Sequence, residues 1–177
     1  MKKLLTTISH AIDRLNEQVG RGVAWLTTAL VLVIMYDVTA RYLFNTSSAG
    51  IVELEWYLFS FIFLLGAAYA LKHERHVRVD VFYQNFSPRR QAWINLVGSV
   101  FFLIPFCIVV IVTSLKFTGN SWAIQEGSPD PGGLPARYIV KAAIPIGFIL
   151  LLLQAISLLI HSLLTLLEPS ETRPEHD

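Results

Sequence analysis

The chain has 177 residues, of which 54% are hydrophobic and 15% are charged, and its mean hydropathy is +0.54. Because a soluble domain carries about a quarter charged residues, this composition indicates a membrane protein rather than a large soluble core. The net charge of +1 provides no basic field, so nucleic acid is not expected as a partner.

The N-terminal segment carries apolar side chains at helical spacing, from Leu4 and Leu5 to Leu15 and Val19. Polar residues separate them, so the pattern predicts an amphipathic helix over residues 1–20 that lies along the cytoplasmic surface of a membrane. A helix that extends the first span toward the N-terminus is the alternative.

Four apolar segments are long enough to cross about 30 Å of hydrocarbon, which takes roughly 20 residues. All four tryptophans lie near the ends of these segments, as expected of aromatic rings at the membrane interfaces. Since open sheet edges are not tolerated in lipid, we predict an all-α integral membrane protein with a polar cytoplasmic tail at residues 164–177. The predicted transmembrane helices are residues 22–44, 51–71, 94–115 and 138–163.

The distribution of Lys and Arg predicts the orientation. Ten of the 14 lie in the N-terminal arm, in the loop between the second and third spans and in the tail, whereas four lie on the other side. Lys and Arg accumulate on the cytoplasmic side of membrane proteins. Both termini and the middle loop are therefore expected in the cytoplasm, and the loop around Asp130 is expected outside.

Two sets of charged residues lie in or near the membrane. Asp37 is in the first span, four residues before Arg41, and a lone carboxylate at that depth is costly. An ion pair within the helix, a contact with a partner protein and a proton site are the three interpretations. Glu53 and Glu55 begin the second span, where a helix N-terminus favours carboxylates; docking of a periplasmic protein is the other interpretation of the two.

The remaining polar residues give no sign of catalysis. His73 and His76 lie in the middle loop, but no further ligand is placed to complete a metal site. Ser87 and Pro88 predict the start of the next helix. Since the sequence shows no Ser/His/Asp set and no phosphate-binding loop, we expect neither enzymatic activity nor a cofactor in this chain.

Several motifs occur in an order and spacing that are specific in combination. They are DVTARYLFN (Asp37 to Asn45), Glu53 leading into WYLF, LGAAYALKH (Leu65 to His73), HVRVDVFY (His76 to Tyr83), SPRR (Ser87 to Arg90), SPDPGGLPARY (Ser128 to Tyr138) and IPIGF (Ile144 to Phe148). With these motifs the chain resembles the small membrane subunit of tripartite ATP-independent periplasmic (TRAP) transporters, the DctQ-like family, over most of its length.

The resemblance implies a subunit of a heteromeric complex in the bacterial inner (cytoplasmic) membrane. Its partners would be a large DctM-like membrane subunit and a periplasmic substrate-binding protein. The resemblance also implies sodium-driven uptake of an organic acid, with an elevator motion in the large subunit and the small subunit as a fixed scaffold that helps dock the binding protein. Candidate interface residues are Asp37, Arg41, Glu53, Arg78, Asp80, Pro131, Gly132, Gly133, Pro135 and Arg137.

The loop before the fourth span combines three prolines with Gly132 and Gly133. Proline restricts the backbone and glycine permits a tight turn, so we interpret this loop as a rigid periplasmic surface that contacts the large subunit or the binding protein. A loop that only positions the fourth span is the alternative. Within that span, Ala143 and Gly147 form a small-xxx-small pattern suited to close helix packing.

Two other functions have to be weighed. A self-contained four-helix exporter needs a membrane carboxylate that faces a cavity, and Asp37 is the one candidate. A membrane anchor for a redox enzyme needs histidines deep in facing helices to hold haem, whereas His161 lies near the cytoplasmic end of its span.

Overall fold

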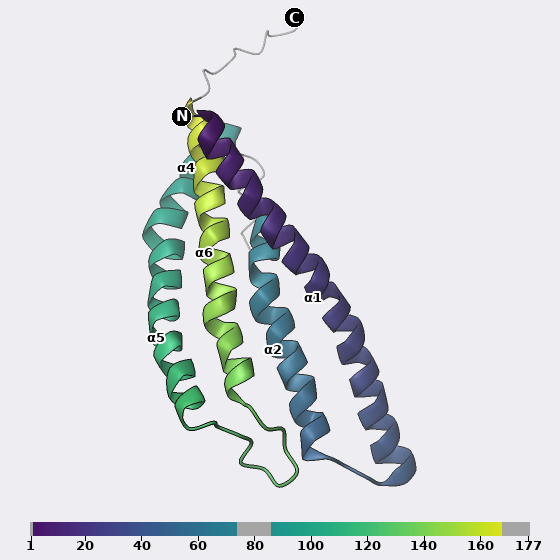
Figure 1. The fold of residues 1–177 in the computed structure, drawn as a ribbon. Coiled ribbons are helices and arrows are strands. Elements are labelled where there is room, and N and C mark those ends of the chain that lie inside the picture. Colours follow the sequence, from purple (N-terminus) through teal and green to yellow (C-terminus); the bar gives the residue numbers. More distant parts are fainter. Residues whose placement is uncertain (1, 74–85, 168–177) are drawn as a thin grey trace, which may run out of the picture.

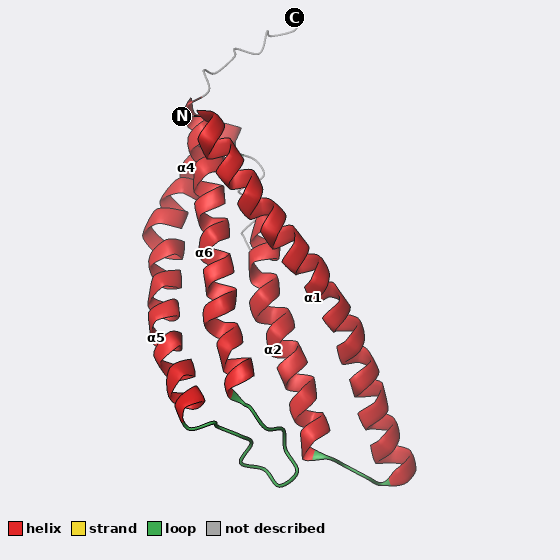
Figure 2. Ribbon diagram, in the orientation of Figure 1, coloured by secondary structure: helices red, strands yellow, loops and turns green. Residues whose placement is uncertain are grey.

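The computed structural model describes residues 2–73 and 86–167, which form long helices joined by loops, with no strand in these ranges (Figures 1 and 2). Four helical stretches are long and apolar enough to cross a membrane, which confirms the predicted all-α membrane fold. The elements are α1 (Lys2–Phe44), α2 (Ala49–Lys72), α4 (Pro88–Gly98), the π-helical turn η1 (Ser99–Leu103), α5 (Ile104–Ala123) and α6 (Tyr138–Leu167).

The N-terminal segment is helical but does not form a separate helix. Residues 2–20 continue without a break into the first predicted span, so α1 is a single helix of 43 residues. Ser9 and Asn16, in this segment, are buried, and their side chains or carbonyls bond to α6. This is the N-terminal extension that the sequence left as the alternative, and an independent helix along the membrane surface is not confirmed.

α1 and α2 pack as an antiparallel pair. Glycine allows the close approach at Gly20, where a Cβ would lie 2.1 Å from the ring of Tyr69. From Glu17 to Val23, each step of three residues along α1 meets a step of three in the reverse direction along α2. The contacts that fix this register are Glu17 with Lys72, Gly20 with Tyr69 and Val23 with Gly66.

α6 is the central helix. It contacts α1, α2, α4 and α5, while α1 and α5 lie at opposite edges of the molecule (Figure 1). Half of the residues in its most apolar stretch are buried, against 11% in the corresponding stretch of α1. Ala143 is buried, and a Cβ at Gly147 would lie 2.5 Å from the carbonyl oxygen of Leu64. The predicted small-xxx-small pattern therefore does bring α6 against α2.

The third span is longer and less regular than predicted. Ser87 and Pro88 begin α4 as expected, and helical structure then continues through η1 to Ala123. Pro105, the second residue of α5, lacks the N–H that would bond to the carbonyl of Phe101, which accounts for a non-α turn just before it.

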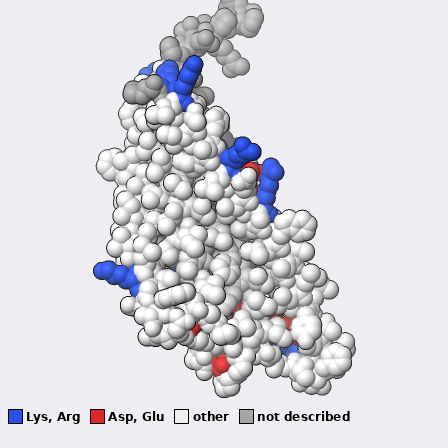
Figure 3. Space-filling model, viewed as in Figure 1, with Lys and Arg blue, Asp and Glu red and all other residues white. Residues whose placement is uncertain are grey.

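Charged side chains lie toward the two ends of the molecule on the face drawn in Figure 3, with uncharged surface between them. Large apolar side chains such as Trp25, Phe63 and Phe102 are exposed along the helices. An exposed apolar band between two polar ends is what lipid or another membrane helix covers.

Candidate functional site

The loop between α5 and α6, residues 124–137 and hereafter the outer loop, closes on itself through backbone hydrogen bonds. The Ser128 amide donates to the Leu134 carbonyl at 3.1 Å, and the Gly133 amide donates to the Asp130 carbonyl at 3.0 Å. At the base, the Arg137 amide donates to the Glu126 carbonyl at 2.8 Å. These bonds give a loop without regular secondary structure a defined shape.

Glu53 of α2 holds this loop from the membrane side. Its side chain is buried, with 4% of the residue exposed. One carboxylate oxygen accepts a hydrogen bond from the Ser128 hydroxyl, and the other accepts one from the Leu134 amide at 2.6 Å. Hydrogen bonds to a carboxylate are stronger than those between neutral groups. Glu53 is therefore more than a favourable charge at a helix start, and it fixes the outer loop to α2.

The backbone conformation at Gly132 and the close contacts at Gly133 both require glycine. Gly132 has φ of +78°, in the left-handed region that glycine adopts without strain. A Cβ at Gly133 would lie 2.3 Å from the Ser128 hydroxyl oxygen and 2.8 Å from a carboxylate oxygen of Glu53. Pro131, Gly132 and Pro135 are exposed. The sequence-predicted loop residues thus form an ordered turn with an exposed tip.

Arg137 lies at the base of the outer loop and not at its tip. Its guanidinium stacks over the ring of Trp56, 5.4 Å from the ring centroid. Beside it, the Lys141 ammonium bonds to the Glu126 carboxylate. That bond holds the pKa of Glu126 below its ordinary value.

Asp37 and Arg41 form an ion pair within α1. The Asp37 side chain is 4% exposed, whereas the Arg41 side chain is 52% exposed, so the carboxylate is buried and the guanidinium reaches outward. The second oxygen of Asp37 has no hydrogen-bond partner within residues 2–73 and 86–167. The ion pair is thus present, and the structure does not bring it to Glu53 or the outer loop by any bond. Arg78 and Asp80, the other predicted interface residues, lie outside the described residues.

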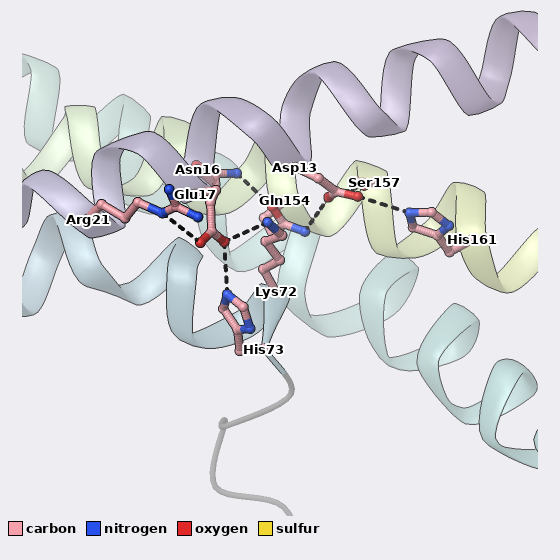
Figure 4. Close-up of polar contacts among 9 residues, drawn as sticks. All are labelled: Asp13, Asn16, Glu17, Arg21, Lys72, His73, Gln154, Ser157 and His161. Carbon is pink, nitrogen blue, oxygen red and sulfur yellow. Dashed lines mark hydrogen bonds and ion pairs between the residues drawn. The ribbon is translucent and has the colours of Figure 1, made fainter.

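A second polar cluster, which the sequence reasoning missed, lies at the other end of α2 from Glu53, and its contacts are drawn in Figure 4. One part is built on Glu17 of α1. Its carboxylate accepts hydrogen bonds from Arg21 at 3.1 Å and from Lys72 at 2.7 Å, and it lies 3.0 Å from the His73 ring. Lys72 and His73 come from the end of α2, so Glu17 fastens α1 to α2. We call the whole set the inner polar cluster: Asp13, Asn16, Glu17, Arg21, Lys72, His73, Gln154, Ser157 and His161.

The other part of the inner polar cluster joins α1 to α6. Asp13 accepts hydrogen bonds from Ser157 at 2.7 Å and Gln154 at 2.9 Å, and it lies 3.1 Å from the His161 ring. The Asn16 amide donates to the Gln154 carbonyl at 2.7 Å. The available signal was the recurrence of Gln154, Ser157 and His161 on one face of an otherwise apolar helix.

These arrangements bind helices and a loop to one another. Within residues 2–73 and 86–167, no group of three His, Cys, Asp or Glu side chains is placed to hold a metal ion. Cys107 is fully buried and packs with Leu71 and Leu151. The described polar residues therefore support a structural and interaction role.

Comparisons with known proteins agree on one kind of protein. Residues 30–165 match the family described as "Tripartite ATP-independent periplasmic transporters, DctQ component". The chain is 27% identical over 149 residues to the "C4-dicarboxylate TRAP transporter small permease protein DctQ" of Vibrio cholerae, and the match covers 73% of this chain and 64% of that protein. It is 26% identical over 148 residues to a "Putative TRAP transporter small permease protein" of Haemophilus influenzae, covering 84% of this chain and 90% of that protein. The chain thus spans just under two thirds of the length of the Vibrio cholerae relative.

Proposed function

Since the chain belongs to the family of DctQ components of tripartite ATP-independent periplasmic transporters, we propose that it is the fixed small subunit of a sodium-coupled uptake system for an organic acid. In this role it supports a large elevator-type membrane subunit and helps dock a periplasmic substrate-binding protein. In this proposal the chain lies in the bacterial inner membrane, with both termini and the inner polar cluster on the cytoplasmic side.

The contact between Glu53 and the outer loop carries this proposal. A buried carboxylate bonds to both sides of the loop turn, at Ser128 and Leu134, and leaves the tip at Pro131 and Gly132 exposed. A loop fixed in this way loses little conformational entropy when a partner binds. Such a tip at the outer end of a membrane subunit suits repeated docking of a soluble protein.

The burial of the described charges argues against transport by this chain alone. Asp37, the candidate proton site of an exporter, is paired with Arg41 within its own helix. Glu53 and Glu126 are bonded to the outer loop and to Lys141. A carboxylate that binds and releases a coupling ion must exchange partners during each cycle, and these contacts join parts of a static scaffold.

Reconstitution tests the proposal. The chain alone in liposomes should give no sodium-dependent uptake, whereas the chain with the large subunit and the binding protein of the same system should. The first substrates to offer are C4-dicarboxylates, since the name of the Vibrio cholerae relative specifies them. Sodium-dependent uptake by the chain alone would overturn the scaffold role in favour of a self-contained transporter.

Docking is tested separately by the double variant Gly132→Val and Gly133→Val. Added side chains meet a positive φ at Gly132 and close contacts at Gly133, so the turn must change shape. The matched control is Gly127→Val in the same loop, because a Cβ at Gly127 meets nothing within 4 Å.

The double variant should raise the binding-protein concentration that gives half-maximal uptake, with the yield of the small–large complex unchanged. The control should behave like the wild type. A lower complex yield with an unchanged concentration dependence would show that the outer loop only positions α6.

A further inference from the structure

A pocket of about 400 Å³ opens beside α6 near the outer end of the molecule. α2 and α6 form two of its sides and Phe117 of α5 the third. Its lining residues are Trp56, Ser60, Leu64, Phe117, Glu126, Arg137, Val140, Lys141 and Ile144.

The pocket runs from a polar mouth to an apolar floor. Trp56 and Arg137 mark the outer end, and Leu64 and Ile144 mark the inner end. Seven to eight helical residues separate these levels, which is about 10–12 Å at about 1.5 Å per residue. The floor closes where α2 and α6 touch at Gly147 and Leu64. The pocket therefore descends from the level of lipid headgroups into the outer part of the hydrocarbon.

Arg137 supplies the mouth with a cation that bonds to no acceptor side chain in the part of the protein that the structure describes. Arg137 is half-buried with its guanidinium over Trp56, and no described residue forms a side-chain hydrogen bond or ion pair with it. Glu53 and Glu126 lie near enough to interact with its charge, but both oxygens of Glu53 bond to the outer loop and one oxygen of Glu126 bonds to Lys141. Five N–H donors in a fixed plane suit a phosphate group.

We propose that this pocket binds a glycerophospholipid of the outer leaflet, with its phosphodiester on the Arg137 guanidinium and the first part of an acyl chain against Leu64 and Ile144. The cation and the apolar floor lie about as far apart as the phosphate and upper acyl chain of one lipid. The lipid fills the gap that α2, α5 and α6 leave on the outer side and ties the base of the outer loop to the membrane.

The test is photolabelling of the chain, assembled with its large subunit, by phosphatidylglycerol that carries a diazirine near the head of one acyl chain. Arg137→Gln removes the guanidinium, and Lys116→Gln, on the exposed surface of α5, removes a charge outside the pocket as the matched control. Ser60→Phe fills the pocket, and Thr113→Phe adds the same side chain at an exposed site on α5.

Labels in the wild type should map to the α2 and α6 sides of the pocket. Arg137→Gln should lower labelling at subsaturating lipid about tenfold, equivalent to about 1.4 kcal/mol, and Ser60→Phe should abolish it, while both controls label as the wild type. Equal labelling of the wild type and Arg137→Gln, or equal labelling by a diacylglycerol that lacks the phosphate, would overturn the proposal. So would an absence of labelling in the assembled complex together with a crosslink from Arg137 to a carboxylate of the large subunit, because a protein contact would then occupy the mouth.

Discussion

Replacing the buried amide pair of the inner polar cluster tests how α1 is held to α6. Asn16 and Gln154 are 1% and 3% exposed, and a hydrogen bond of 2.7 Å joins them across 138 residues of sequence. Asn16→Leu and Gln154→Met keep roughly the same shape and remove the amides. In the double variant both partners of the hydrogen bond are replaced, so neither amide is left unpaired and the two apolar side chains can pack together.

The structure predicts different costs for the two single variants. Gln154→Met leaves the Asn16 amide with only its long 3.5 Å hydrogen bond to the Leu150 carbonyl and removes a donor from Asp13, so it should destabilise the chain by about 1–3 kcal/mol, the cost of a poorly satisfied buried group. Asn16→Leu leaves the Gln154 oxygen without its donor but keeps the bond from Gln154 to Asp13. It also removes an Asn16 oxygen that has no partner among the described residues, so it should cost less than Gln154→Met, about 1 kcal/mol. The double variant should cost less than the sum, with a coupling of at least about 0.5 kcal/mol.

The assay is reversible unfolding in mixed micelles by increasing sodium dodecyl sulfate, followed by the fluorescence of the four tryptophans. Thr113→Val, at an exposed position on α5, is the control and should change stability by less than about 0.5 kcal/mol. If the two single effects add within experimental error, the amides act independently and the hydrogen bond does not hold α1 to α6.

Three further predictions follow from named contacts. Arg41→Ala should lower the yield of folded protein more than Asp37→Ala, because it strands a buried carboxylate whereas the reverse change strands a guanidinium that is 52% exposed; equal yields would contradict this. The ion pair of Glu126 should add stability that is complete above the ordinary pKa of 4.5 and is lost as the pH falls through the lowered pKa. The difference in unfolding midpoint between the wild type and Glu126→Gln should therefore shrink in acid, and a constant difference would exclude the pair as its source. Reporter fusions after Asn45 and near Asp130 should be active outside the cytoplasm and those after Asn85 inside, and an external signal at Asn85 would overturn the orientation.

The spans were predictable because hydrophobicity and length decide which segments cross a membrane. α2 begins and ends within two residues of the predicted span, and α6 begins at the predicted residue. The continuation of α1 was not decided by this signal, since an amphipathic segment can lie on a surface or pack on a neighbouring helix. What favours packing is the set of polar residues on α6 that face Asp13 and Asn16, and their partners lie more than 130 residues away.

The sequence predicted only part of the candidate site, because it reveals local turn chemistry but not contacts between residues far apart in the chain. Turn chemistry is local, so Gly132 and Gly133 could be recognised as a tight turn from the sequence. The bond from Glu53 to Leu134 spans 81 residues, and nothing near Glu53 distinguishes this role from that of a favourable charge at the start of α2. The same limit applies to Arg137, whose position over Trp56 depends on how α2 and α6 pack.

The arrangement of the helices bears on why this chain would need a larger partner. A transport path has to be enclosed on all sides, yet α1 and α5 lie at opposite edges and α6 alone is well buried among the spans. The polar bonds lie toward the two ends, where Glu53 fixes the outer loop and the inner polar cluster joins α1, α2 and α6. Bonds at both ends resist sliding of one helix past another, while the apolar faces between them remain open to lipid or protein. A subunit whose helices are fixed at both ends and whose apolar faces are uncovered is suited to supporting a moving neighbour. This is how the structure could perform the scaffold role proposed above.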